Sequence, residues 1–199
     1  MSSGHSYLAL GDSYTIGQSV PDSDRYPVQL VHLLSKKGIQ FSSPEIIART
    51  GWTTGDLLHA IPPSKASYDI VTLLIGVNDQ YQGLSRNQYR TAFAELLDSS
   101  IKYARNGAKC VIVLSIPDYS VTPFANSLDT AAIAREIDAF NAINKEISIA
   151  KGVNYLEITV STRMAKFDDS LVAYDGLHPS GKEYKKWANR LAVLIKTIL

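Results

Sequence analysis

Five residues spread along the chain have the side chains and the positions that serine-based acyl transfer needs. Each follows an apolar run with the character of a strand or precedes the last helical segment: Ser13, Gly51, Asn78, Asp175 and His178. A serine hydroxyl attacks a carbonyl carbon once a base takes its proton, and neutral imidazole suits that task near pH 7. These residue types therefore predict nucleophilic chemistry at an ester-like carbonyl, provided that the fold brings them together.

The spacing of these residues suggests a part for each of them. Asp175 precedes His178 by three positions, close enough to hold one imidazole nitrogen while the other faces Ser13. The tetrahedral intermediate carries a negative oxygen that needs several placed donors. The amide of Ser13, the amide of Gly51 and the side chain of Asn78 are the candidates. The prediction is a catalytic set of Ser13, His178 and Asp175 beside an oxyanion hole.

The segments that must position these residues alternate between two hydrophobic periods. Apolar, β-branched runs typical of strands cover 6–10, 44–49, 69–75, 109–116 and 153–158. Segments with helical periodicity cover 27–37, 86–105, 130–150 and 181 to the C-terminus. Near-continuous hydrophobicity is typical of strands buried on both faces of a parallel sheet. The alternation predicts a doubly wound α/β fold, in which ligands bind beyond the carboxyl ends of the strands.

Side chains that can cap helix N-termini support three of these helices. Ser85 with Gln88, and Ser180 with Glu183, have the spacing of capping boxes, and Asp129 is placed to cap the helix 130–150. In the last helix, the inner face is predicted to carry Tyr184, Trp187, Leu191, Leu194 and Ile198.

Length, charge and composition limit the functional classes. The 199 residues fit one domain, 1–199, and a net charge of +1 gives no basis for binding nucleic acid or an anionic membrane. No apolar stretch approaches the roughly 18 residues of a membrane span. No signal peptide is evident, which favours the cytoplasm unless a leader has been removed. The single cysteine, Cys110, lies in an apolar run and is predicted to be a buried free thiol.

Neither a metal nor a cofactor is predicted from the motifs. The chain has no His-Glu-x-x-His sequence and no paired Cys/His spacing. The segment around Ser13 also lacks the lysine of a P-loop. The partner that the residues indicate is a small-molecule acyl ester, and no feature of the sequence specifies an oligomeric state.

Four short motifs resemble the sequence blocks of the GDSL, or SGNH, hydrolases. They are Gly11-Asp12-Ser13, Gly51, Gly76-Val77-Asn78-Asp79 and Asp175-Gly176-Leu177-His178, in the order of that family. The resemblance implies a three-layer α/β/α sandwich with a five-stranded, flavodoxin-like parallel sheet. It implies a metal-independent serine esterase or lipase with Ser13 as nucleophile, His178 as base and Asp175 as its partner. It implies that Ser13, Gly51 and Asn78 form the oxyanion hole.

The same residues also have structural interpretations. Ser13 could cap the helix that begins beside it, and Gly51 and Asn78 could serve only in turns. Asp175 could brace the turn before His178, and His178 itself could be a surface loop residue. Asp12 and Asp79, which flank the proposed donors, are predicted to brace their loops.

The rim of the site and the substrate are less determined by sequence. Segments 79–84 and 117–128 are expected to border the site, where Tyr81, Tyr119 and Phe124 could contact a substrate or cover the sheet edge. The favoured substrates are lysophospholipid-like, thioester or short acyl esters, and the alternative is a carbohydrate O-acetyl ester. An apolar groove would favour the former and a polar, aromatic-lined cleft the latter. An acyltransferase would use the same acyl-enzyme, whereas a non-catalytic flavodoxin-like binding module would have no turnover.

Overall fold

Five parallel strands form one sheet at the centre of the protein, which a computed structural model describes over residues 4–63 and 67–199. The strands are β1 (Tyr7–Gly11), β2 (Glu45–Ala48), β3 (Ile70–Leu74), β4 (Val111–Leu114) and β5 (Asn154–Leu156). Their order across the sheet is β2-β1-β3-β4-β5. The chain therefore adds strands first to one side of β1 and then to the other, which makes the β1/β3 boundary the switch point where such folds bind ligands. The predicted flavodoxin-like sheet is confirmed.

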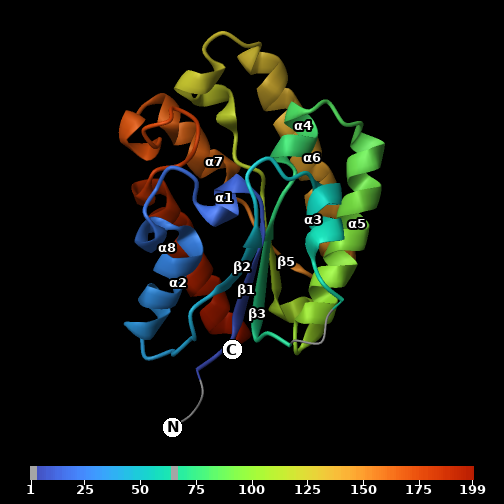
Figure 1. Ribbon diagram of the computed structural model, residues 1–199, viewed down its shortest axis with the longest axis vertical. Helices are drawn as coiled ribbons and strands as arrows, with labels where there is room; N and C mark the ends of the chain where they lie inside the picture. Colours follow the sequence, from blue (N-terminus) through green and yellow to red (C-terminus); the bar gives the residue numbers. More distant parts are fainter. Residues whose placement is uncertain (1–3, 64–66) are drawn as a thin grey trace.

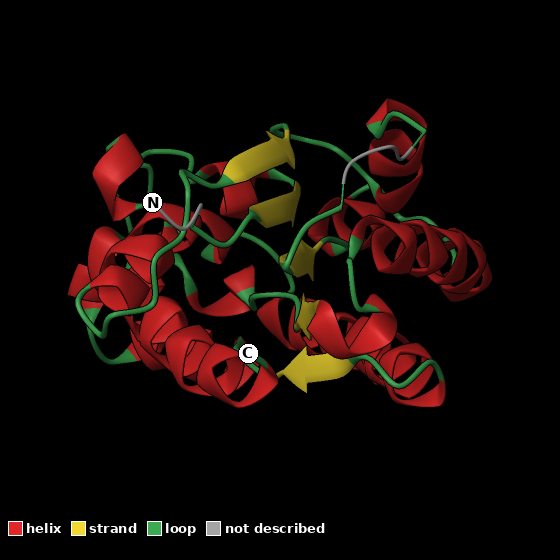
Figure 2. Cartoon of the chain, turned by 90° about the horizontal axis from the view of Figure 1, so that it is seen from below, coloured by secondary structure: helices red, strands yellow, loops and turns green. Residues whose placement is uncertain are grey.

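Helices cover both faces of this sheet (Figure 1). They are α1 (Ser13–Ile16), α2 (Tyr26–Ser35), α3 (Thr54–Ala60), α4 (Val77–Tyr81), α5 (Arg86–Tyr103), α6 (Thr130–Ala150), α7 (Thr159–Thr162) and α8 (Gly181–Ile198). Helices α2 and α8 pack together on one face, and α3, α5 and α6 cover the other. Figure 2 shows the strands between the two helical layers. The predicted three-layer α/β/α architecture is therefore confirmed.

The central strands explain the continuous apolar runs of the sequence. Every residue of β1, β3 and β4 is buried, because helices cover both faces of these strands. The edge strands β2 and β5 are partly exposed, and each begins with a polar residue, Glu45 and Asn154 respectively. Cys110, directly before β4, is a buried free thiol, as predicted.

The register of β1 on β3 sets the position of the candidate site. Gly11, the last residue of β1, lies opposite Leu74, the last residue of β3. The segments that follow these two strands therefore leave the sheet side by side, and they carry Ser13 and Asn78. This pairing brings two of the five candidate residues to one edge of the sheet.

The inner face of α8 follows the predicted period, but two of its five predicted residues are only half-buried. Tyr184, Trp187 and Leu191 are buried, as expected. Ala192 and Ile195 are buried as well, whereas Leu194 and Ile198 are half-buried and pack against the core. Ile195 lies four positions after Leu191, which is the helical spacing that continues one stripe along the face.

Two of the three predicted N-terminal caps are complete, and the third has only one of the two hydrogen bonds of a capping box. The capping box of α5 and the Asp129 cap of α6 are present. At α8, the Ser180 hydroxyl accepts the amide of Glu183, but the Glu183 carboxylate does not return to the cap. It accepts the indole N–H of Trp187 at 2.8 Å instead. A buried indole needs an acceptor, and this demand explains why the prediction was wrong for the second half of the box.

Three short helices, α3, α4 and α7, were not predicted from hydrophobic periodicity because they are too short to show it. Helix α3 does carry a local signal, since Thr53 and Asp56 form a reciprocal capping box at its start. Among the helices of the described residues, none is both long and apolar enough to cross a membrane.

Candidate active site

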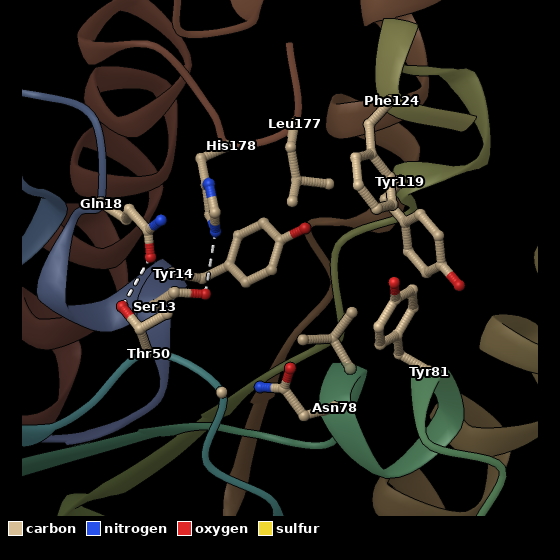
Figure 3. A pocket seen from close by; sticks show the side chains of 12 residues that line it. Ser13, Tyr14, Gln18, Thr50, Asn78, Tyr81, Tyr119, Phe124, Leu177 and His178 are labelled. Atoms are coloured by element: carbon tan, nitrogen blue, oxygen red, sulfur yellow. Dashed lines mark hydrogen bonds between the residues drawn. The ribbon is translucent and has the colours of Figure 1, made fainter. Parts of the chain in front are cut away.

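A continuous series of hydrogen bonds connects Ser13, His178 and Asp175, and Figure 3 shows its first bond, between Ser13 and His178. His178 Nε2 is 2.9 Å from Ser13 Oγ, and His178 Nδ1 is 2.6 Å from Asp175 Oδ2. The serine and the histidine are both buried, although 165 positions separate them in the sequence. The structure thus places the three residues within the distance that proton transfer requires.

Helix α1 positions the Ser13 hydroxyl and amide. Asp12 caps this helix, because its Oδ1 accepts the amide of Tyr14 at 2.9 Å. The cap is therefore Asp12 and not Ser13, and Asp12 braces the loop as predicted. Ser13 occupies the first turn, where helix amides have no partner within the helix and remain available as donors.

Gly17 explains the second glycine of this segment. It ends α1 in the left-handed conformation with φ of +69°, which glycine adopts at little cost. A Cβ at this position would lie 2.3 Å from the side chain of Arg25. Both the backbone conformation and the space around it therefore require glycine four residues after Ser13.

Burial controls the ionisation of Asp12. Burial raises the pKa of this carboxyl to about 8, although hydrogen bonds from backbone amides act in the opposite direction. An aspartate in an unfolded chain titrates near pH 3.9. Between these pKa values the folded protein binds one more proton than the unfolded chain. The contribution of Asp12 to the free energy of unfolding therefore falls as the pH rises from about 4 to about 8.

Asp12→Asn is expected to remove this pH-dependent contribution, because an amide oxygen can still accept the Tyr14 amide but carries no charge. The free energy of unfolding of the variant, relative to wild type, should increase between about pH 4 and about pH 8. Urea unfolding across this range measures the difference. Asp169→Asn, at an exposed carboxylate, is the control for replacing an aspartate on the surface. A difference for Asp12→Asn that does not change with pH would contradict the expectation.

Both oxygens of the Asp175 carboxylate are occupied. Oδ1 accepts the amides of Leu177 and His178, each at 3.0 Å. Oδ2 accepts the Ser19 hydroxyl at 2.6 Å as well as the imidazole of His178. Asp175 therefore braces the turn and holds the imidazole at the same time, so the two sequence interpretations of this residue are compatible.

Hydrogen bonding keeps Asp175 charged. Partial burial acts to raise the pKa of this carboxyl, but the hydrogen bonds from Ser19, His178 and two backbone amides outweigh it and lower the pKa to about 2. A charged carboxylate next to Nδ1 favours the tautomer with its proton on Nδ1. In that tautomer Nε2 has a free lone pair directed at Ser13.

Gly51 and Asn78 lie at the pocket that contains Ser13. Gly51 has φ of +82°, and a Cβ built there would meet nothing within 4 Å. The backbone conformation rather than crowding by the protein thus requires this glycine. Asn78 donates one side-chain N–H to the carbonyl of Trp52 at 2.9 Å. A primary amide has a second N–H, which can serve a substrate.

Helix α4 fixes the loop that carries Gly51. In addition to the Asn78 bond, the Gln82 side chain donates to the Gly51 carbonyl at 3.3 Å. Asp79 accepts the amide and the hydroxyl of Thr54 at the start of α3, at 2.9 and 3.0 Å. These contacts agree with the predicted bracing role of Asp79.

A cavity of about 240 Å³ opens beside Ser13. Its apolar and aromatic lining comes from Tyr14, Val77, Tyr81, Tyr119, Phe124 and Leu177 (Figure 3). The ring centroids of Tyr81, Tyr119 and Phe124 lie 6.1–6.3 Å apart, so the three rings form a continuous aromatic wall. Segments 79–84 and 117–128 therefore border the cavity, as expected.

The opposite side of the cavity is polar. Gln18 and Thr50 meet there, with Thr50 Oγ1 donating to Gln18 Oε1 at 2.5 Å (Figure 3). Trp52, the residue after Gly51, packs against the hydrophobic core with its side chain half-buried. Within the described ranges, no three His, Cys, Asp or Glu side chains gather as a metal site would require.

Comparison with known proteins identifies both the sequence pattern and the fold. The model of the GDSL-like lipase/acylhydrolase family matches residues 9–186. The structure of TesA superposes with a TM-score of 0.77 at 17% identity, over 98% of this chain and 99% of that chain. No curated protein matches the chain.

Two further solved structures are similar over nearly their full lengths. A W215I form of Axe2, an acetyl xylan esterase from Geobacillus stearothermophilus, gives a TM-score of 0.74 at 19% identity, over 97% of this chain and 95% of that chain. The psychrotrophic esterase EstA from Pseudoalteromonas sp. gives 0.72 at 16% identity, over 97% of each chain. At these identities the likeness establishes the shared fold.

Proposed function

Because the chain belongs to the GDSL-like lipase/acylhydrolase family, we propose that it hydrolyses carboxylic esters through an acyl-enzyme on Ser13. The observation that carries the proposal is the hydrogen-bonded series from Ser13 through His178 to Asp175. This arrangement activates a serine for nucleophilic attack, which a binding module without turnover does not need.

The geometry supports a two-step reaction. His178 Nε2 takes the proton of Ser13 while Oγ attacks the substrate carbonyl carbon, whose oxygen becomes an oxyanion. The imidazolium then gives this proton to the leaving alkoxide, and the acyl group remains on Ser13. In the second step His178 removes a proton from water, the hydroxide attacks the acyl carbon, and the proton returns to Ser13 as the acid leaves. Asp175 stabilises the imidazolium in both steps.

The amides of Ser13 and Gly51 and the free N–H of Asn78 are the proposed donors to the oxyanion. Asn78→Ala is expected to lower kcat by about 100- to 1000-fold, the usual loss for one such donor. Gln82→Ala is the matched control, because it removes another tie between α4 and the same loop without a donor to the substrate. Steady-state kinetics on a p-nitrophenyl ester measure both variants. Equal losses in the two would assign Asn78 to loop anchoring instead.

The aromatic wall supports an apolar acyl group as the substrate part that the cavity receives. In the proposed mechanism the leaving group lies beside His178, which protonates the departing oxygen, and the acyl chain faces the wall of Tyr81, Tyr119 and Phe124 (Figure 3). This favours lipid-like, thioester or short acyl esters. The exposed ring of Tyr81 is the feature that favours the second candidate, a carbohydrate O-acetyl ester, since such a ring can stack on a sugar.

Phe124→Ala is expected to lower the preference for octanoate over acetate esters by about five- to ten-fold, because part of the apolar contact of a longer chain is lost. The kcat/KM values for p-nitrophenyl acetate, butyrate and octanoate measure this preference. Phe167→Ala, at an exposed ring outside the cavity, is the control. An unchanged preference in Phe124→Ala, together with faster hydrolysis of acetylated xylo-oligosaccharides, would favour the carbohydrate substrate.

A fluorophosphonate probe tests the reaction class directly, since it reacts with activated serines. We expect labelling of wild type at the peptide that contains Ser13, with loss of ester hydrolysis in proportion to labelling. No labelling and no turnover of p-nitrophenyl acetate or butyrate at neutral pH would contradict the proposal and favour the binding module.

A further inference from the structure

Ser19 adopts a backbone conformation that serine rarely adopts. Its φ is +66°, and among the described residues it is the only non-glycine with positive φ. This region is unfavourable for a residue with a Cβ, and such residues persist where surrounding contacts hold them, often at functional sites. The contact at Ser19 is its hydroxyl, which donates to Asp175 Oδ2 at 2.6 Å.

This hydrogen bond completes the coordination of the carboxylate. Oδ1 of Asp175 accepts two backbone amides of its own turn, those of Leu177 and His178. Oδ2 accepts the imidazole of His178, and the Ser19 hydroxyl is the second donor to that oxygen. Each carboxylate oxygen thus has two partners, which matches its acceptor capacity and fixes its plane. Ser19 alone among them comes from outside the segment 175–178.

One short segment therefore contains Ser13 and contacts both His178 and Asp175. Residues 13–19 begin with the Ser13 hydroxyl on His178 Nε2 and end with the Ser19 hydroxyl on Asp175. Between them the Tyr14 ring packs against the imidazole, with centroids 5.2 Å apart. The left-handed turn at Gly17 reverses the chain so that its two ends reach opposite ends of the hydrogen-bonded series.

We propose that Ser19 is a positioning residue, which holds Asp175 so that the carboxylate keeps His178 directed at Ser13. This inference rests on the proposed function for its kinetic consequence. Its structural consequence, an ordered His178–Asp175 hydrogen bond, exists whether or not an ester is turned over.

Two substitutions of Ser19 separate its hydroxyl from its backbone strain. Ser19→Ala removes the hydroxyl and keeps a Cβ at positive φ, whereas Ser19→Gly removes the hydroxyl and relieves the strain. Ser19→Gly should therefore unfold at a higher temperature than Ser19→Ala. Both should lose about ten-fold in kcat with little change in KM, as expected for the loss of one hydrogen bond to a charged group. Ser23→Ala, at an exposed serine bonded to Asp24, is the control and should behave as wild type.

Proton NMR supplies the readout that does not depend on turnover. The imidazole N–H of His178, held by the carboxylate at 2.6 Å, should give a far-downfield resonance in wild type, assigned with ¹⁵N-histidine labelling. We expect this resonance to broaden or vanish in both Ser19 variants and to persist in Ser23→Ala. A wild-type resonance or a wild-type kcat in both Ser19 variants would overturn the positioning role. The two ideas can also fail separately. If the wild-type protein hydrolyses no ester but both Ser19 variants lose the resonance, the positioning role is supported and the proposed function is contradicted.

Discussion

Ser13→Ala is expected to lower kcat for p-nitrophenyl butyrate by at least about 10⁴-fold. The hydroxyl of Ser13 is the atom that would carry the acyl group, and it is the one that His178 Nε2 contacts at 2.9 Å. No other group in the series of hydrogen bonds can replace it. The donors to the oxyanion remain in the variant, so a small residual rate from binding and electrostatic stabilisation is expected.

The fold should survive this substitution. Ser13 lies in the first turn of α1, which Asp12 rather than Ser13 caps, so alanine leaves the N-cap intact. Thermal unfolding and circular dichroism compare the two proteins. Ser99→Ala is the matched control, because its hydroxyl only contacts the Glu95 carbonyl within α5. Retention of more than about a tenth of the wild-type kcat in a folded Ser13→Ala protein would contradict the acyl-enzyme mechanism.

Asp175→Asn is expected to lower kcat by about 10⁴-fold, the loss seen when such a carboxylate becomes an amide of the same shape. Oδ1 of Asp175 accepts two backbone amides, so the amide oxygen of the variant should take that place. The NH₂ group would then face His178 Nδ1 and the Ser19 hydroxyl. It can only donate to Nδ1, which moves the imidazole proton to Nε2. The histidine would then point a proton, and not a lone pair, at Ser13.

A second aspartate provides the control for this variant. Hydrogen bonds from Lys182 and Ser170 lower the pKa of Asp168 to about 2, the same range as for Asp175, but Asp168 has no contact with His178. Asp168→Asn should therefore retain wild-type kcat. The Ser19 variants should cost nothing further in the Asp175→Asn background, since the carboxylate through which Ser19 acts is already gone. A loss below about ten-fold in Asp175→Asn would show that His178 keeps its orientation without the carboxylate.

The sequence alone was sufficient for the fold class and for the identity of the candidate residues. Buried parallel strands need continuous apolar runs, and amphipathic helices need a regular stripe, so both leave periodic signals that act within one element. The capping box of α5 and the Asp129 cap are also local signals, since each depends on residues three positions apart. Ser13, Asn78 and His178 could be named because each stands in a short motif at the end of such an element.

The tertiary structure decided the contacts that no local pattern encodes. Glu183 has the spacing of a capping residue, but the burial of Trp187 against it gave its carboxylate another partner. Ser19 stands in no motif, and it reaches Asp175, 156 positions away, only because Gly17 turns the chain and α8 packs beside α2. Local propensity acts over a few residues, whereas a contact of this kind depends on how whole elements pack. The sequence therefore determined which groups could react and that Asp175 could hold His178, whereas packing determined the distant contact that holds Asp175 in turn.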